Sequence, residues 1–263
     1  MPGLSSDDLS EAAHRLTAAG CVAAEEEAGE LAAAAGGDAG VLAALVGRRA
    51  VGEPLAWITG TVVFCGCDIV VLPGVYVPRW QSEPLAERAV ELLSSGGRAI
   101  DLGTGSGAIA RVLLEHRPEA SILGTERDPL AAMCARRNGV TVAEGDLFGG
   151  VPTSWGGTVD VVVGVLPYVP SDQIAYLPRD VRAFEPLSAL DGGHDGLAVV
   201  RRAVAETGRW LKKGGHLLLE VGGDQPGAIG PVLEAEGFEQ VRVISDADGD
   251  PRGVEAVAVS GTR

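Results

Sequence analysis

The chain is poor in aromatic residues and in positive charge, and each shortage limits the classes of protein to which it can belong. Phe, Trp and Tyr make up only 4% of its 263 residues, although 46% are hydrophobic, so a substantial and largely aliphatic core is expected. Lys and Arg number 21 against 36 Asp and Glu, which gives a formal net charge of −15. A protein that binds a nucleic-acid backbone needs a cationic surplus to displace counterions, so no direct nucleic-acid binding is expected.

Cysteines and long apolar runs are also scarce. Of the four cysteines, Cys65 and Cys67 are separated by one residue, whereas zinc sites usually place two to four between their ligands. We expect both thiols on one face of a strand, where they pack, and no metal site. The opening residues are acidic rather than signal-like, and no apolar run reaches the ~18 residues of a membrane span. These features predict a cytoplasmic protein that does not contact a membrane.

The N-terminal residues favour helices, and a β-hairpin is expected to follow them. Ser5 and Asp8 have the spacing of a capping box in front of a segment, 5–47, that is rich in helix formers. The segment 61–72 has the pattern of two short strands around a turn. The sequence therefore predicts a helical domain over 1–60, a hairpin linker over 61–82 and a larger domain over 83–263.

The larger domain alternates strands with helices after an amphipathic helix at 83–95. This alternation predicts an α/β fold with a doubly wound, mostly parallel sheet of the Rossmann-like type. The last two strands are expected to form an antiparallel pair at the sheet edge. The expected strands are 98–103, 121–125, 140–144, 158–165, 215–221, 239–244 and 253–259, and the expected helices are 107–116, 128–137, 195–210 and 226–236.

A glycine-rich turn in "AIDLGTGSGAIA", residues 99–110, carries the clearest functional signal. It lies between a predicted strand and a predicted helix, where Gly103, Gly105 and Gly107 let the backbone turn sharply and approach a ligand. The motif also satisfies the glycine pattern of dinucleotide-binding folds. The glycines alone therefore do not distinguish a nicotinamide cofactor from an adenosyl cofactor.

Three carboxylates follow three successive predicted strands. Asp101 either caps the glycine turn or attracts a cationic ligand, and it would repel a pyrophosphate. Glu126 can accept hydrogen bonds from a ribose diol. A dehydrogenase would use a carboxylate at this position in the same way, so Glu126 alone does not distinguish the two cofactors. Asp146 either caps its loop or accepts from an adenine amine, with Leu147 and Phe148 against the ring. Together they fit S-adenosylmethionine (SAM) better than a cofactor with a pyrophosphate.

Several segments resemble the protein glutamine methyltransferases that modify the Gly-Gly-Gln motif of peptide release factors. They include "VPRWQSE" at 77–83, the glycine turn, "FEPLSALDGGHDGL" at 184–197 and "GGHLLLEVGGDQ" at 214–225. The resemblance extends over nearly the whole chain and implies a release-factor-like protein substrate. It also implies that SAM contacts Asp101, Gly103, Thr104, Gly105, Gly107, Glu126, Arg127, Asp146, Leu147 and Glu83.

The family's Asn-Pro-Pro-Tyr strand exit is replaced here by Val165, Leu166, Pro167 and Tyr168. In the family, the Asn side chain and the next backbone carbonyl accept hydrogen bonds from the target amide. The resemblance therefore implies that the Leu166 carbonyl, Pro167 and Tyr168 shape the acceptor slot, while Val165 tunes it. Loss of one such hydrogen bond typically costs about 3–4 kcal/mol of transition-state stabilisation.

Glutamine methylation on a release-factor-like protein is thus the leading hypothesis. A methyltransferase retargeted to an amine or hydroxyl of a small molecule or another protein is the first alternative, because Val165 makes the slot less polar. A catalytically silent SAM-binding homologue and a nicotinamide-dependent oxidoreductase are the others. Arg79 either pairs with a carboxylate in the site or lies on the surface, and His194 is either a general base or a solvated loop residue.

Overall fold

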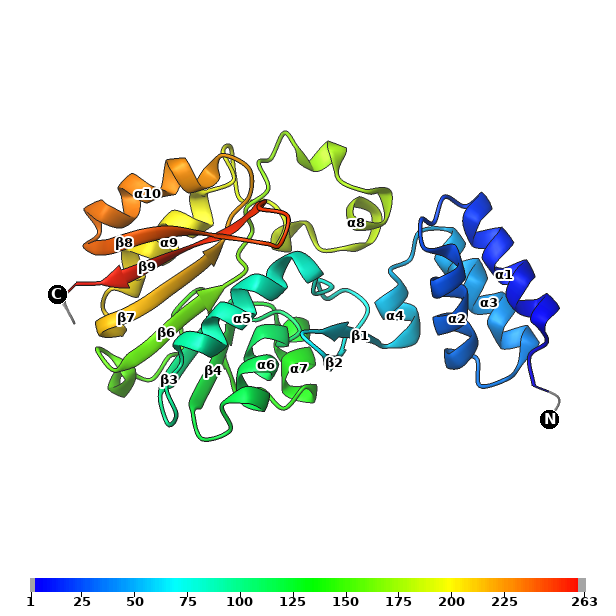
Figure 1. Cartoon of the computed structure of the whole chain (residues 1–263), viewed down its shortest axis with the longest axis horizontal. Helices are drawn as coiled ribbons and strands as arrows, with labels where there is room; N and C mark the ends of the chain where they lie inside the picture. Colours follow the sequence, from blue (N-terminus) through cyan, green and yellow to red (C-terminus); the bar gives the residue numbers. More distant parts are fainter. Residues whose placement is uncertain (1–2, 260–263) are drawn as a thin grey trace.

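A separate bundle of helices forms one end of the molecule. The structure, a computed structural model, describes residues 3–259. The predicted capping box is present, because the Ser5 hydroxyl accepts the N–H of Asp8 and the Asp8 carboxylate accepts the N–H of Ser5. Helices α1 to α3 lie away from the central sheet (Figure 1) and share a small core of their own. The four helices are α1 (Ser6–Ala18), α2 (Ala24–Ala34), α3 (Ala39–Ala50) and α4 (Leu55–Thr59).

The predicted β-hairpin follows α4 and consists of β1 (Thr61–Phe64) and β2 (Cys67–Val70). The expectation that Cys65 and Cys67 share one strand face is wrong. Cys65 and Gly66 form the turn itself, with φ angles of 46° and 72°. A two-residue hairpin turn favours positive φ at both positions, so one cysteine lies in the turn and the other in a strand.

A seven-stranded sheet forms the centre of the larger part, in the order β5-β4-β3-β6-β7-β9-β8. The first five strands in this order are mutually parallel, and β9 runs antiparallel to both β7 and β8. The predicted α/β fold and the antiparallel edge pair are therefore confirmed. The strands are β3 (Arg98–Leu102), β4 (Ser121–Glu126), β5 (Val142–Glu144), β6 (Val159–Gly164), β7 (Leu211–Glu220), β8 (Phe238–Ser245) and β9 (Pro251–Ala258).

Helices cover both faces of this sheet (Figure 1). Every residue of the central strand β6 is buried, and successive valines face opposite cores. Val161 and Val163 belong to the core that packs against α5, α6 and α7, whereas Val162 faces α9 and α10. These helices are α5 (Glu83–Leu92), α6 (Ala108–His116), α7 (Pro129–Arg137), α9 (Ala198–Thr207) and α10 (Gln225–Ala235).

The helix predicted over 195–210 and the strand predicted from 215 both have different bounds in the structure. Helix α9 ends at Thr207, and β7 already begins at Leu211. Gly214 has a φ of 76°, and the register with β6 shifts nearby, so the glycines make an irregularity inside β7 rather than its start. A further short helix, α8 (Arg179–Phe184), was not predicted. Within residues 3–259, no helix combines the length and the apolar character needed to cross a membrane.

Asn138 fastens the hairpin to the larger part. Its side-chain oxygen accepts the N–H of Val70 at 2.8 Å, and its side-chain nitrogen donates to the carbonyls of Val70 at 2.9 Å and Ser106 at 2.8 Å. The residue is only 8% exposed, so these backbone groups have little access to water if the amide is lost.

We expect Asn138→Ala to lower the free energy of unfolding by about 1–3 kcal/mol, because it leaves buried backbone groups of Val70 and Ser106 without a partner. Urea denaturation followed by circular dichroism measures the change. The control is Gln173→Ala, which removes an exposed amide. Equal effects of the two substitutions would show that Asn138 does not hold the hairpin.

Candidate functional site

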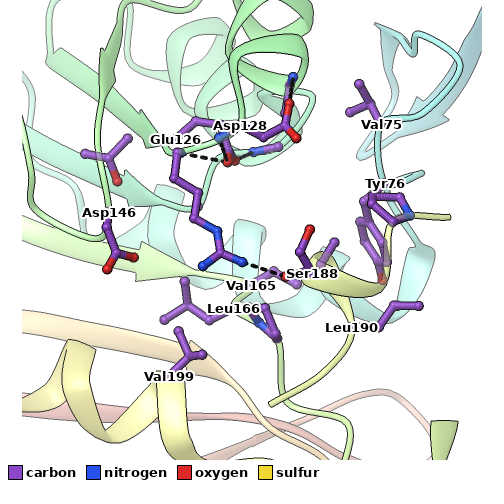
Figure 2. A pocket seen from close by; sticks show the side chains of 18 of the residues that line it. Val75, Tyr76, Glu126, Asp128, Asp146, Val165, Leu166, Ser188, Leu190 and Val199 are labelled. Atoms are coloured by element: carbon purple, nitrogen blue, oxygen red, sulfur yellow. Dashed lines mark hydrogen bonds between the residues drawn. The ribbon is translucent and has the colours of Figure 1, made fainter. Parts of the chain in front are cut away.

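A cavity lies at the carboxyl ends of β3, β4 and β6. Within the sheet, β4 lies on one side of β3 and β6 lies on the other. The direction in which successive strands are added therefore reverses at β3. Open α/β sheets bind ligands at such a reversal point. The main cavity has a volume of about 140 Å³ and is lined by Gly103, Glu126 and Val165, from the ends of these three strands. Figure 2 shows Glu126, Asp146, Val165 and Leu166 around it.

The glycine turn forms one wall of the cavity. Gly103 and Gly105 have φ angles of 61° and 57°, which L side chains rarely adopt. A Cβ atom at Gly103 would lie 3.0 Å from Cδ2 of Leu166. Glycine is therefore favoured at 103 by conformation, and a side chain there would also require Leu166 to shift.

Glu126 holds the turn in place. Its Oε2 accepts the N–H of Gly105 at 2.9 Å, while Oε1 accepts the N–H groups of Arg127 at 2.8 Å and Asp128 at 2.9 Å. One carboxylate therefore joins the glycine turn to the loop after β4. Oε2 keeps one acceptor site free of described partners, and Glu126 lines the main cavity, so this oxygen can receive a ligand hydroxyl.

Asp101 caps the turn and also borders a second cavity. Its Oδ2 accepts the hydroxyl of Thr104 at 2.6 Å and the N–H of Ala110 at 3.1 Å. The side chain is almost fully buried, and this burial raises its pKa to about 7, against the opposing effect of those two hydrogen bonds. The loop cavity, about 50 Å³, is lined by Asp101 and Thr104 and shares Gly103, Gly105, Tyr76 and Val165 with the main cavity.

Asp146 and Leu147 line the far end of the main cavity. The Asp146 carboxylate is half-exposed and forms an ion pair with Arg202 at 2.5 Å. The prediction that Phe148 packs on a ligand ring is wrong. Phe148 is buried and stacks on Trp210, with ring centroids 5.5 Å apart, so it belongs to the core.

The exit of β6 forms the opposite wall of the main cavity. Val165 borders both the main cavity and the loop cavity, and Leu166, Pro167 and Tyr168 line the main cavity beside it. The Tyr168 hydroxyl donates to Oε1 of Glu220 at 2.8 Å, which fixes the ring. Among the described residues, no hydrogen bond occupies the Leu166 carbonyl. The predicted acceptor residues thus lie opposite the glycine turn.

Two predicted cofactor residues lie elsewhere. Glu83 does not line either cavity, because its carboxylate accepts the N–H of Cys65 at 2.8 Å and supports the hairpin turn. Gly107 precedes α6, where a Cβ would come within 2.9 Å of Val140, so this glycine serves helix packing. His194 is exposed in its loop, whereas Arg79 pairs with the buried Glu185 at 2.6 Å, and neither member of this pair lines the main cavity or the loop cavity.

Several cavity residues were not predicted. Val75 and Tyr76 come from the segment after the hairpin, and Ser188 and Leu190 come from the loop before α9 (Figure 2). Arg127 donates to the backbone carbonyl of Ser188 at 3.2 Å and joins this loop to the end of β4. The only sequence signal for these residues was their place in or beside the segments 77–83 and 184–197.

Several known proteins with similar sequences carry the same name. The chain is 37% identical over 214 residues to the release factor glutamine methyltransferase of Geobacter sulfurreducens, covering 79% of this chain and 74% of that protein. It is 33% identical to the enzyme of that name from Agrobacterium fabrum, covering 80% of this chain and 76% of the relative. The chain belongs to the release factor glutamine methyltransferase family. It is therefore a methyltransferase, and this excludes the oxidoreductase hypothesis.

Solved structures of other methyltransferases have the same fold as this chain. The chain superposes on a methyltransferase from Pyrococcus furiosus with a TM-score of 0.54 at 21% identity, covering 81% of this chain and 97% of that one. A ribosomal protein L11 methylase from Lactobacillus delbrueckii gives a TM-score of 0.51 at 15% identity, covering 74% of this chain and 86% of that one. No family sequence model matches the chain.

The raised pKa of Asp101 predicts a pH-dependent stability. Because its pKa is about 7 in the folded state and 3.8 ordinarily, the folded protein holds a proton between these values that the unfolded chain releases. The resulting stabilisation is complete below pH 3.8 and is lost as the pH rises to 7.

Asp101→Asn removes this titration and keeps an oxygen acceptor for Thr104 and Ala110. We therefore expect the variant to gain stability over the wild type as the pH rises from 4 to 7.5, by at most about 4 kcal/mol. Urea unfolding across this range measures the difference in stability. All other groups titrate in both proteins, so their contributions cancel in this difference. A constant difference across the range would contradict a raised pKa.

Proposed function

We propose that the protein transfers a methyl group from SAM to the side-chain amide of a glutamine in a release-factor-like protein. The relatives named above support this substrate class. The observation that carries the proposal is the main cavity, in which Gly103 and Glu126 face the β6 exit at Val165 and Leu166. Such a cavity can bring a cofactor and a methyl acceptor into contact.

The two connected cavities fit SAM. The free acceptor site on Oε2 of Glu126 would receive a ribose hydroxyl, and Asp146 and Leu147 would border the adenine. Asp101 and Thr104, with Gly103 and Gly105, would border the amino-acid end in the loop cavity. When bound, SAM supplies a methyl group on a positively charged sulfur. The buried carboxylate of Asp101 favours a cationic ligand nearby.

The β6 exit would position the acceptor. The amide nitrogen of glutamine is a weak nucleophile because its lone pair is delocalised, so the protein must hold and aim it. The Leu166 carbonyl would accept one of its N–H groups, Pro167 fixes the turn, and Glu220 holds the Tyr168 ring beside it. The transfer would be a direct displacement without a covalent bond to the protein. The amide nitrogen would bond to the methyl carbon as the carbon–sulfur bond breaks, S-adenosylhomocysteine would leave, and the nitrogen would lose one proton to solvent.

A retargeted methyltransferase is the second candidate, and Val165 is the observation that favours it. This half-buried side chain borders both cavities, at the position where the resemblance described above implies an asparagine in the family. An amide N–H placed against Val165 would lose a hydrogen-bond partner, at a cost of roughly 1–3 kcal/mol. An amine or hydroxyl acceptor needs less help of this kind.

The deciding measurement is transfer of labelled methyl from SAM to the Gly-Gly-Gln glutamine of a purified release factor. We expect slow labelling by the wild type and an increase of about 10²–10³-fold in rate for Val165→Asn, which restores the second acceptor. Val63→Asn, at an exposed position of β1, is the matched control and should leave the rate unchanged.

The other outcomes are equally informative. Equal rates for the wild type and Val165→Asn would mean that the Leu166 carbonyl suffices. If neither protein labels the glutamine while both bind SAM, the release-factor substrate is wrong and a retargeted or silent protein takes its place.

A further inference from the structure

A third cavity adjoins the main cavity on the other side of Tyr168. This outer cavity has a volume of about 400 Å³ and is lined by Tyr76, Gln81, Tyr168, Glu220 and Arg252, among others. Tyr76, Tyr168, Val169 and Leu190 border both the outer and the main cavity, so the wall between the cavities contains both tyrosines. A molecule in the outer cavity therefore lies next to the proposed acceptor slot.

Two residues that line this cavity carry unpartnered hydrogen-bond acceptors. Oε2 of Glu220 and Oε1 of Gln81 are buried and make no hydrogen bond to any residue within 3–259, and both residues line the cavity. Glu220 is only 4% exposed, so water has little access to its carboxylate. A third unpartnered oxygen, Oε2 of Glu185, lies on the carboxylate that pairs with the lining residue Arg79. Buried acceptors without partners are uncommon in folded proteins, and here they gather at one place.

The electrostatics of Glu220 agree with a missing donor. Burial raises the pKa of its carboxyl, and the hydroxyls of Ser82 and Tyr168 only partly oppose this effect. The Ser82 hydroxyl nevertheless makes no well-aligned hydrogen bond to Oε2. A bound N–H group would supply the missing hydrogen bond and favour the charged carboxylate.

The ligand that fits these acceptors is neutral and carries N–H groups. Two arginines, Arg79 and Arg252, and two acidic residues, Asp180 and Glu220, line the cavity, so its charges balance and do not call for a charged ligand. A peptide main chain offers N–H donors to Glu220 and Gln81 without a net charge. Its carbonyl groups also suit the N–H groups that Arg79 does not use in its pair with Glu185.

The surroundings of the outer cavity favour a protein over a free small molecule. Trp80 is 58% exposed and lies against the guanidinium of Arg252, with the guanidinium carbon 5.1 Å from the ring centroid. Tyr176, next to the lining residue Leu177, is 86% exposed. Exposed Trp, Tyr and Arg side chains beside a pocket are typical of protein-binding surfaces.

We propose that the outer cavity binds the main chain of the protein substrate next to its methylated side chain, through N–H groups donated to Glu220 and Gln81. This inference rests on the proposed function, since it assigns a second subsite to the same protein substrate. The acceptor side chain would pass Tyr168 into the main cavity, while the flanking peptide stays outside the tyrosine wall.

The test is the affinity of a purified release factor for the full-length protein, measured by calorimetry with S-adenosylhomocysteine present. We expect Glu220→Gln to weaken binding about 10- to 100-fold, since a hydrogen bond to a charged group is lost, and Gln81→Met to weaken it about 3- to 10-fold. The affinity for S-adenosylhomocysteine itself should not change. Glu236→Gln removes the same charge from an exposed site and is the matched control.

Tyr168→Phe separates this subsite from a purely structural role of Glu220. It removes the hydroxyl bond to Oε1 but keeps the Glu220 carboxylate at the cavity wall, so it should weaken binding less than Glu220→Gln. If it reproduces the whole loss, Glu220 acts only through Tyr168 and the subsite is wrong. If the wild type methylates the release factor and both Glu220→Gln and Gln81→Met bind it normally, the subsite alone is wrong. No binding and no methylation by the wild type overturns the proposed function and the subsite together.

Discussion

The site depends on one carboxylate that binds three backbone N–H groups. Glu126 joins the turn at Gly105 to the start of the loop at Arg127 and Asp128, and so fixes two strand exits relative to each other. Hydrogen bonds to a charged acceptor are stronger than neutral ones, and this residue is nearly buried. These three backbone hydrogen bonds fix the orientation of the carboxylate. The remaining acceptor site on Oε2 is therefore positioned to bind a ligand.

The acceptor side is built in a similar way around a second buried glutamate. Glu220, at the end of β7, lines the outer cavity and holds the hydroxyl of Tyr168 with one oxygen, while its other oxygen is buried without a described partner. The ring of Tyr168 then separates two spaces of different character. On one side lies the cleft between the glycine turn and Val165, and on the other lies a larger space bordered by Arg79 and Arg252.

The sequence predicted the sheet, the glycine turn and most of the cavity, because each of these follows from local patterns. Buried valines mark β6, and a carboxylate after a strand marks a ligand edge. It did not predict Tyr76 or Glu220, since only the fold brings the hairpin exit and the end of β7 beside Tyr168. We also predicted Glu83 and Phe148 at the cofactor, and the structure places both side chains elsewhere. Their sequence neighbours line the cavities, but their own side chains face the hairpin turn and the core.

The most direct test is a crystal structure of the protein with S-adenosylhomocysteine and a peptide that contains the Gly-Gly-Gln sequence. We predict a ribose hydroxyl on Oε2 of Glu126, the glutamine side chain beside Leu166, and a peptide N–H on Oε2 of Glu220. A cofactor bound away from the Gly103–Gly105 turn, or a peptide that avoids the β6 exit, would contradict the account.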